Sequence, residues 1–135
     1  MTTKYFKITD VTSRQSLDAL EEAGGIIRRG GLVVFPTETV YGLGGDATSA
    51  VSAKAIYAAK GRPADNPLII HVASPGDAEL YTITNPTYER LAAAFMPGPL
   101  TVILPSKPVI PREVRAGLET VAVRCPSHPV ANAFI

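Results

Sequence analysis

The sequence contains a single cysteine, Cys125, among its 135 residues. One cysteine cannot form a disulfide bond within the chain, which fits a protein of a reducing compartment. The 13 Lys and Arg residues nearly balance the 12 Asp and Glu residues, and the net charge is +1. Because this charge is small, the chain lacks the overall positive field that draws proteins to nucleic acids or anionic membranes. Such contacts have to come from local basic clusters.

Long apolar segments are also missing. No run approaches the roughly 18 apolar residues of a membrane-spanning helix. Residues 1–7 lack the apolar core of a signal peptide. We therefore predict a cytoplasmic protein that has no membrane partner.

Several familiar binding motifs are absent as well. The sequence has no Gly-x-x-x-x-Gly-Lys-Ser/Thr phosphate loop, no Cys and His cluster with zinc spacing, and no Gly-x-Ser-x-Gly nucleophile elbow. The glycines at positions 42, 44 and 45 do not complete a dinucleotide-binding fingerprint. We therefore predict no metal site, and a nucleotide would need a less common arrangement.

The composition is that of a folded globular chain, with 46% hydrophobic and 19% charged residues. The length suits one domain over residues 1–135. Residues 130–135 form an apolar turn without a C-terminal cap. We therefore expect a single domain that is incomplete at its C-terminus.

Periodicity and turn signals predict alternating helices and short strands. Helices are predicted over 13–29, 49–60, 75–80 and 88–95, and another is predicted to begin after 126–129. Short apolar runs predict buried strands over 32–35, 68–72, 100–104 and 120–124. We expect strand 32–35 to be covered on both faces and to pair in parallel with strand 68–72 through a right-handed crossover. This pattern predicts an α/β fold.

Polar side chains follow three of these strands, at positions where α/β proteins commonly bind ligands. Thr37, Glu38 and Thr39 follow strand 32–35. The hydroxyls of Thr37 and Thr39 either hold a polar ligand or satisfy amides of the turn, and the Glu38 carboxylate is a single candidate ligand for a metal or an amine. His71 lies at the end of an apolar strand, where the alternative to ligand binding is a satisfied core histidine. Arg124 ends strand 120–124 and needs a carboxylate or phosphate partner.

A basic corner follows helix 49–60. It contains Lys60, Arg62 and Asn66, which together suit a polyanion such as a nucleotide phosphate. The alternative is compensation of the helix dipole, but prolines at 63 and 67 stiffen this corner and favour binding. Cys125 and His128 are interpreted as a packing residue and a turn-orienting residue.

Four blocks together resemble the YrdC/TsaC family. They read PTETVYGL at 36–43, KGRP and NPL within 60–68, PGPLT at 97–101, and VRCPSHP at 123–129. The blocks follow the family's order, and the resemblance covers residues 15–135. It implies a twisted, open, mixed sheet flanked by helices. It also implies an L-threonylcarbamoyladenylate synthase, which makes threonylcarbamoyl-AMP and pyrophosphate from L-threonine, bicarbonate or carbon dioxide, and ATP, for modification of tRNA next to the anticodon.

The resemblance also implies roles for individual residues. The ATP-binding residues would be Lys60, Arg62, Asn66 and Thr120, with Lys60 and Arg62 as catalytic residues. The L-threonine-binding residues would be Thr39, His71 and Arg124. Mg²⁺ would accompany ATP, and the implied macromolecular partners are tRNA or double-stranded RNA and the proteins of the threonylcarbamoyl-transferase complex. Family members carry a further Ser-x-Asn motif beyond the last residue of this chain.

Three other interpretations remain. The chain is an RNA-binding module without synthase chemistry, a YrdC-like domain of a carbamoyl-transferring maturation enzyme, or a fragment that keeps the fold without activity. Use of ATP that depends on threonine separates the synthase from these alternatives.

Overall fold

The structure is a computed structural model that describes residues 2–135. Its helices are α1 (Arg14–Arg28), α2 (Ala50–Lys60), α3 (Pro86–Phe95) and α4 (Pro129–Phe134), with a 3₁₀ helix, η1 (Pro75–Leu80). Its strands are β1 (Val33–Phe35), β2 (Gly42–Gly44), β3 (Ile69–His71), β4 (Thr101–Pro105) and β5 (Thr120–Arg124). The predicted α/β class is confirmed, and none of the described helices is long and apolar enough to cross a membrane.

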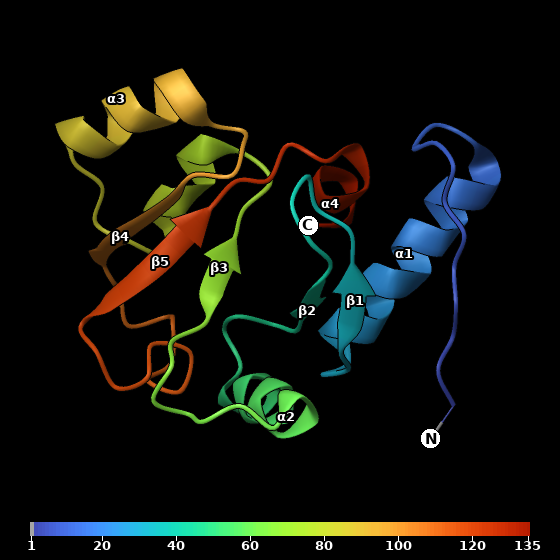
Figure 1. Ribbon diagram of the computed structural model, residues 1–135, viewed down its shortest axis with the longest axis horizontal. Helices are drawn as coiled ribbons and strands as arrows, with labels where there is room; N and C mark the ends of the chain where they lie inside the picture. Colours follow the sequence, from blue (N-terminus) through green and yellow to red (C-terminus); the bar gives the residue numbers. More distant parts are fainter. Residues whose placement is uncertain (1) are drawn as a thin grey trace.

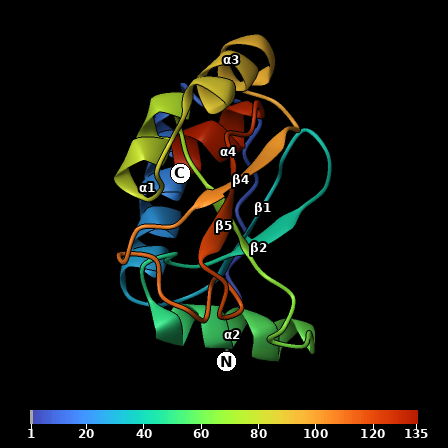
Figure 2. The ribbon, with the colours of Figure 1, turned by 90° about the vertical axis from the view of Figure 1, so that its left-hand side faces the viewer.

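The strands form two small sheets rather than one. β5 lies between β3, which is parallel to it, and β4, which is antiparallel to it. β1 pairs only with β2, in antiparallel register. Figure 1 shows the three-stranded sheet beneath α3, with β1, β2 and α1 on the other side of the molecule. In both views α2 and α3 lie at opposite ends (Figure 2).

The predicted parallel pairing of strands 32–35 and 68–72 is wrong. The partner of β1 is the glycine-rich segment β2, which the sequence pattern did not distinguish from a turn. The absence of side chains at Gly42 and Gly44 leaves room for the ring of Phe35, since a Cβ atom on Gly44 would come within 2.9 Å of that ring. β3 instead finds its parallel partner in β5.

The prediction that strand 32–35 is covered on both faces is also wrong. Val34 in β1 is 62% exposed, and Ile103 in β4 is 68% exposed. Only alternate residues of the three-stranded sheet enter the core, where Ile70 and Val123 pack with residues of η1 and α3. A sheet covered on one face leaves its other face free for a functional site.

Local signals fixed the helix ends well. The Ser49 hydroxyl accepts a hydrogen bond from the Ser52 amide at the start of α2, and Gly61 ends this helix with a φ of 57°. At the start of α4, Nδ1 of His128 accepts a hydrogen bond from the Val130 amide. Cys125 is fully buried, as expected for a packing residue.

The contact between Phe35 and Gly44 makes a testable prediction about stability. Gly44→Val should destabilise the fold by about 1–3 kcal/mol because the Phe35 ring, held against His71 and Phe134, has little room to move. Gly76→Ala is the matched control, since no atom lies within 4 Å of its added Cβ. Urea unfolding measures both, and equal effects of the two substitutions would contradict this packing.

Candidate functional site

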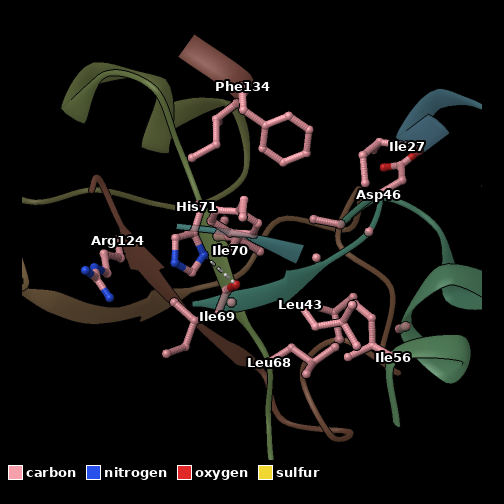
Figure 3. Close-up of a pocket in the computed structure, with 18 of the residues that line it drawn as sticks. Ile27, Leu43, Asp46, Ile56, Leu68, Ile69, Ile70, His71, Arg124 and Phe134 are labelled. Carbon is pink, nitrogen blue, oxygen red and sulfur yellow. Dashed lines mark hydrogen bonds between the residues drawn. The ribbon is translucent and has the colours of Figure 1, made fainter. Parts of the chain in front are cut away.

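A cleft of about 540 Å³ lies between the two sheets. Its lining comes from β1, β2 and β3, from α2 and the segment entering it, from the end of β5, and from the ends of α1 and α4. Figure 3 shows His71 and Arg124 on neighbouring strands at one side, whereas Leu43, Ile56 and Leu68 gather at another. The cleft therefore combines polar strand ends with an apolar wall.

His71 and Arg124 are aligned by the sheet itself. They are register partners in the parallel pair β3 and β5, so their side chains leave the same face of the sheet. Their neighbours Ile70 and Val123 point into the core. Alternation along both strands therefore directs His71 and Arg124 into the cleft.

Arg124 is held by the loop that follows β1. Its Nη2 atom forms an ion pair with Oε1 of Glu38 and donates a hydrogen bond to Oγ1 of Thr39 at 3.2 Å. The side chains of Arg124 and Glu38 are 12% and 20% exposed. Burial lowers the pKa of Arg124, and the paired carboxylate stabilises its charge.

Glu38 also binds the turn between β5 and α4. Its Oε2 accepts hydrogen bonds from the backbone amide of Ser127 and, at 2.5 Å, from the Ser127 hydroxyl. The sequence offered one weak signal, a carboxylate between two threonines after a strand, and no signal for Ser127. Thr37 has the turn-forming role, since its Oγ1 accepts from the amides of Thr39 and Val40.

His71 is half-buried between aromatic and backbone groups. The Phe35 ring meets its ring edge-on, with 5.7 Å between centroids, and Nδ1 lies 3.2 Å from the carbonyl oxygen of Ile69. Burial lowers the pKa of His71, and the contact with the Ile69 carbonyl opposes this shift only in part. Since a carbonyl only accepts, Nδ1 donates to it, which leaves Nε2 of the neutral ring as an acceptor.

The basic corner contributes two cations to the cleft. Lys60 is exposed at the end of α2, and its Nζ has no hydrogen-bond or ion-pair partner within residues 2–135. Arg62 Nη2 donates to the carbonyl oxygens of Asn66 at 3.2 Å and Pro67 at 2.9 Å, so it also orders its own turn. Arg62 Nε is buried without an acceptor in the described part of the chain.

The predicted site residues are therefore only partly brought together. The cleft is lined by Lys60, Arg62, His71 and Arg124, and Thr39 reaches it through Arg124. The other two lie apart. Asn66 is exposed outside the lining, and Thr120 pairs with Pro105 at the opposite end of β5 from Arg124.

The residues also bear on Mg²⁺. Residues 2–135 contain no group of three or more His, Cys, Asp or Glu side chains placed to hold a metal ion. Among the described residues that line the cleft, Asp46 has the one carboxylate side chain, and it accepts hydrogen bonds from the amide and hydroxyl of Thr48. The described residues therefore do not form a dedicated metal site.

Comparison with known proteins decides the family. A family model for Sua5, YciO and YrdC proteins, described as telomere recombination, matches residues 25–135. The chain belongs to the Sua5/YciO/YrdC family. The predicted relationship to YrdC proteins is thereby confirmed.

Curated members of the Sua5/YciO/YrdC family include threonylcarbamoyl-AMP synthases. The chain is 56% identical to the synthase of Pyrococcus abyssi over 114 residues, which are 84% of this chain and 34% of that protein. It is 48% identical to the Bacillus subtilis synthase, over 93% of this chain and 38% of the relative. The chain thus spans about a third of the length of these two relatives.

Solved structures of the Sua5/YciO/YrdC family share this fold. P. abyssi Sua5 complexed with L-threonine matches with a TM-score of 0.83 at 53% identity, over 86% of this chain and 34% of that one. Escherichia coli YciO matches with a TM-score of 0.78 at 25% identity, over 87% and 57% of the two chains. The mixed α/β architecture is therefore that of the family.

Burial of His71 predicts its titration. Its imidazole should titrate below the roughly 6.5 of an exposed histidine, because its desolvated pocket disfavours the charged ring. The unfolded chain then takes up the proton first, so this contribution to stability is complete above about pH 6.5 and is lost as pH falls through the folded pKa. NMR titration of the ring, repeated in urea as the control, measures both values, and equal midpoints would contradict burial.

Proposed function

We propose that this chain provides the substrate-binding cleft of a threonylcarbamoyl-AMP synthase. The proposal rests on one observation above all, which is that Arg124 and His71 are aligned across β3 and β5 with Thr39 bonded to Arg124. The names of the relatives and the L-threonine complex of P. abyssi Sua5 support the same activity. They favour it over a carbamoyl-transferring maturation enzyme.

The amino acid would lie against the polar side of the cleft. Arg124 would bind the carboxylate of L-threonine because a guanidinium group forms charge-assisted hydrogen bonds with a carboxylate. Thr39 and the acceptor Nε2 of His71 would bind its hydroxyl and amino groups. Each of these groups lies on a strand or on the loop attached to one, which fixes their spacing.

ATP would lie toward the basic corner. Lys60 supplies a mobile positive charge, and Arg62 supplies hydrogen-bond donors for the phosphate oxygens. Asn66 and Thr120 remain predicted nucleotide contacts, and both would require the nucleotide to extend beyond the lining of the cleft. Mg²⁺ would enter bound to the phosphates, since the protein residues do not form a site of their own.

The reaction would proceed in two steps. The amine of L-threonine attacks carbon dioxide and loses a proton, giving a carbamate. A carbamate oxygen then attacks the α-phosphorus of ATP, and the bond to the β-phosphate breaks, releasing pyrophosphate. No protein nucleophile takes part, and burial raises the pKa of the fully buried Cys125. Alignment of the substrates and neutralisation of phosphate charge would supply the catalysis.

Bicarbonate, contact with tRNA or double-stranded RNA, the transferase complex and a cytoplasmic location remain predictions. They follow from the proposed activity, since its product serves tRNA modification.

The first test is product formation by this chain. Incubation with ATP, Mg²⁺, L-threonine and bicarbonate should yield threonylcarbamoyl-AMP, detected by mass spectrometry, and none should form without threonine. If no product forms here, a longer chain that includes the Ser-x-Asn motif is the next sample. Failure of both, together with salt-sensitive RNA binding, would replace the synthase by an RNA-binding module.

The second test concerns Lys60. Lys60→Ala should reduce turnover by at least about 100-fold, because it removes charge stabilisation of the phosphates. Folding stability should change by no more than about 0.5 kcal/mol, since Lys60 is exposed. Lys54→Ala is the matched control, as it removes an exposed lysine from the same helix outside the cleft. Similar turnover in both variants would exclude Lys60 from the mechanism.

A further inference from the structure

The two sheets are joined across the cleft by very few polar contacts. β1 and β2 share no strand pairing with the three-stranded sheet. Within residues 2–135, the side-chain hydrogen bonds that connect residues 33–44 to β5 and the turn after it come from Glu38 and Thr39. The relative position of the two sheets at the polar end of the cleft therefore depends on this loop.

Glu38 is the centre of these contacts. One carboxylate oxygen pairs with Arg124, and the other accepts two hydrogen bonds from Ser127, so both oxygens are engaged. The adjacent Thr39 hydroxyl lies 3.2 Å from the same guanidinium nitrogen. Val40 and Tyr41, next along the loop, are exposed and provide little packing to hold it. Thr37 orders the loop internally through the amides of Thr39 and Val40, whereas Glu38 attaches the loop to β5 and the turn after it.

We propose that Glu38 is a positioning residue for amino-acid binding, because it holds the loop that carries Thr39 against Arg124. The inference rests on the proposed function, because it assigns the amino acid to these two side chains. Glu38 acts through Arg124 and the loop and need not touch the substrate. Without its charge, Arg124 keeps its place in β5 and Thr39 keeps its contact with Thr37, but the loop loses its ion pair with Arg124, so the distance between Thr39 and Arg124 becomes less well fixed.

The main alternative makes the opposite prediction. If Glu38 competes with the substrate carboxylate for Arg124, its neutralisation frees the guanidinium and tightens binding. Positioning predicts weaker binding and poorer recognition of the substrate hydroxyl. The sign of the change in affinity therefore separates the two roles.

The experiment compares Glu38→Gln with the unsubstituted chain by isothermal titration calorimetry. The dissociation constant for L-threonine should rise at least tenfold, whereas that for ATP should stay within twofold. The preference for L-threonine over L-2-aminobutyrate, which lacks the hydroxyl, should fall at least fivefold. A loss of folding stability alone would weaken the binding of both amino acids equally. The ratio of their two dissociation constants therefore reports positioning.

Two further variants complete the test. Glu119→Gln removes a carboxylate from an exposed ion pair with Arg112. It should leave the dissociation constants for L-threonine, ATP and L-2-aminobutyrate unchanged. Ser127→Ala removes one contact of Glu38 and keeps the amide contact, so it should weaken L-threonine by two- to threefold. Ser127→Ala can be measured even if Glu38→Gln fails to fold. In that case, an unchanged affinity of Ser127→Ala for L-threonine would overturn the proposal.

The outcomes distinguish the two proposals. If the unsubstituted chain binds no L-threonine, the proposed function fails, and the inference fails with it. If it binds L-threonine and Glu38→Gln binds as well or more tightly, the positioning role alone is overturned. Weaker binding with an unchanged preference over L-2-aminobutyrate also overturns it.

Discussion

The buried charge of Arg124 is the constraint on which the site depends. A guanidinium group at the end of β5 has lost most of its water, and breaking a buried ion pair costs about 3–5 kcal/mol. Glu38, which lies in a loop 86 positions earlier in the chain, supplies the carboxylate that pairs with this guanidinium group. The same pairing joins the two small sheets, so the electrostatic requirement of one residue shapes the cleft.

The polar residues of the cleft lie on two kinds of structural element. His71 and Arg124 lie on paired strands, where sheet geometry sets their spacing, while Lys60 and Arg62 lie at the end of a helix and in the turn after it. The first pair suits an amino acid of fixed size. The second suits a flexible polyphosphate chain, because mobile cations tolerate several phosphate positions. The proposed reaction uses no protein nucleophile and would depend on such placement.

Local sequence signals predicted the elements better than their partners. The caps at Ser49 and Gly61 act between near neighbours, and a short sequence window contains everything they need. β2 was not predicted because the local preferences of Gly42 and Gly44 indicate a turn, whereas their antiparallel pairing with β1 and the Phe35 ring beside them are features of the tertiary structure. The parallel pairing of β1 and β3 was wrong because strand order depends on contacts across the whole chain.

The sequence by itself determined the family, the α/β class and the chemical types of the cleft residues, since these follow from motifs and composition. It also placed His71 and Arg124 at strand ends. Only the tertiary structure decided that these two are register partners and that Glu38 and Ser127 complete the Arg124 site. The reason is physical: register and ion pairing join residues more than 50 positions apart, and a linear pattern carries no information on which distant segments meet.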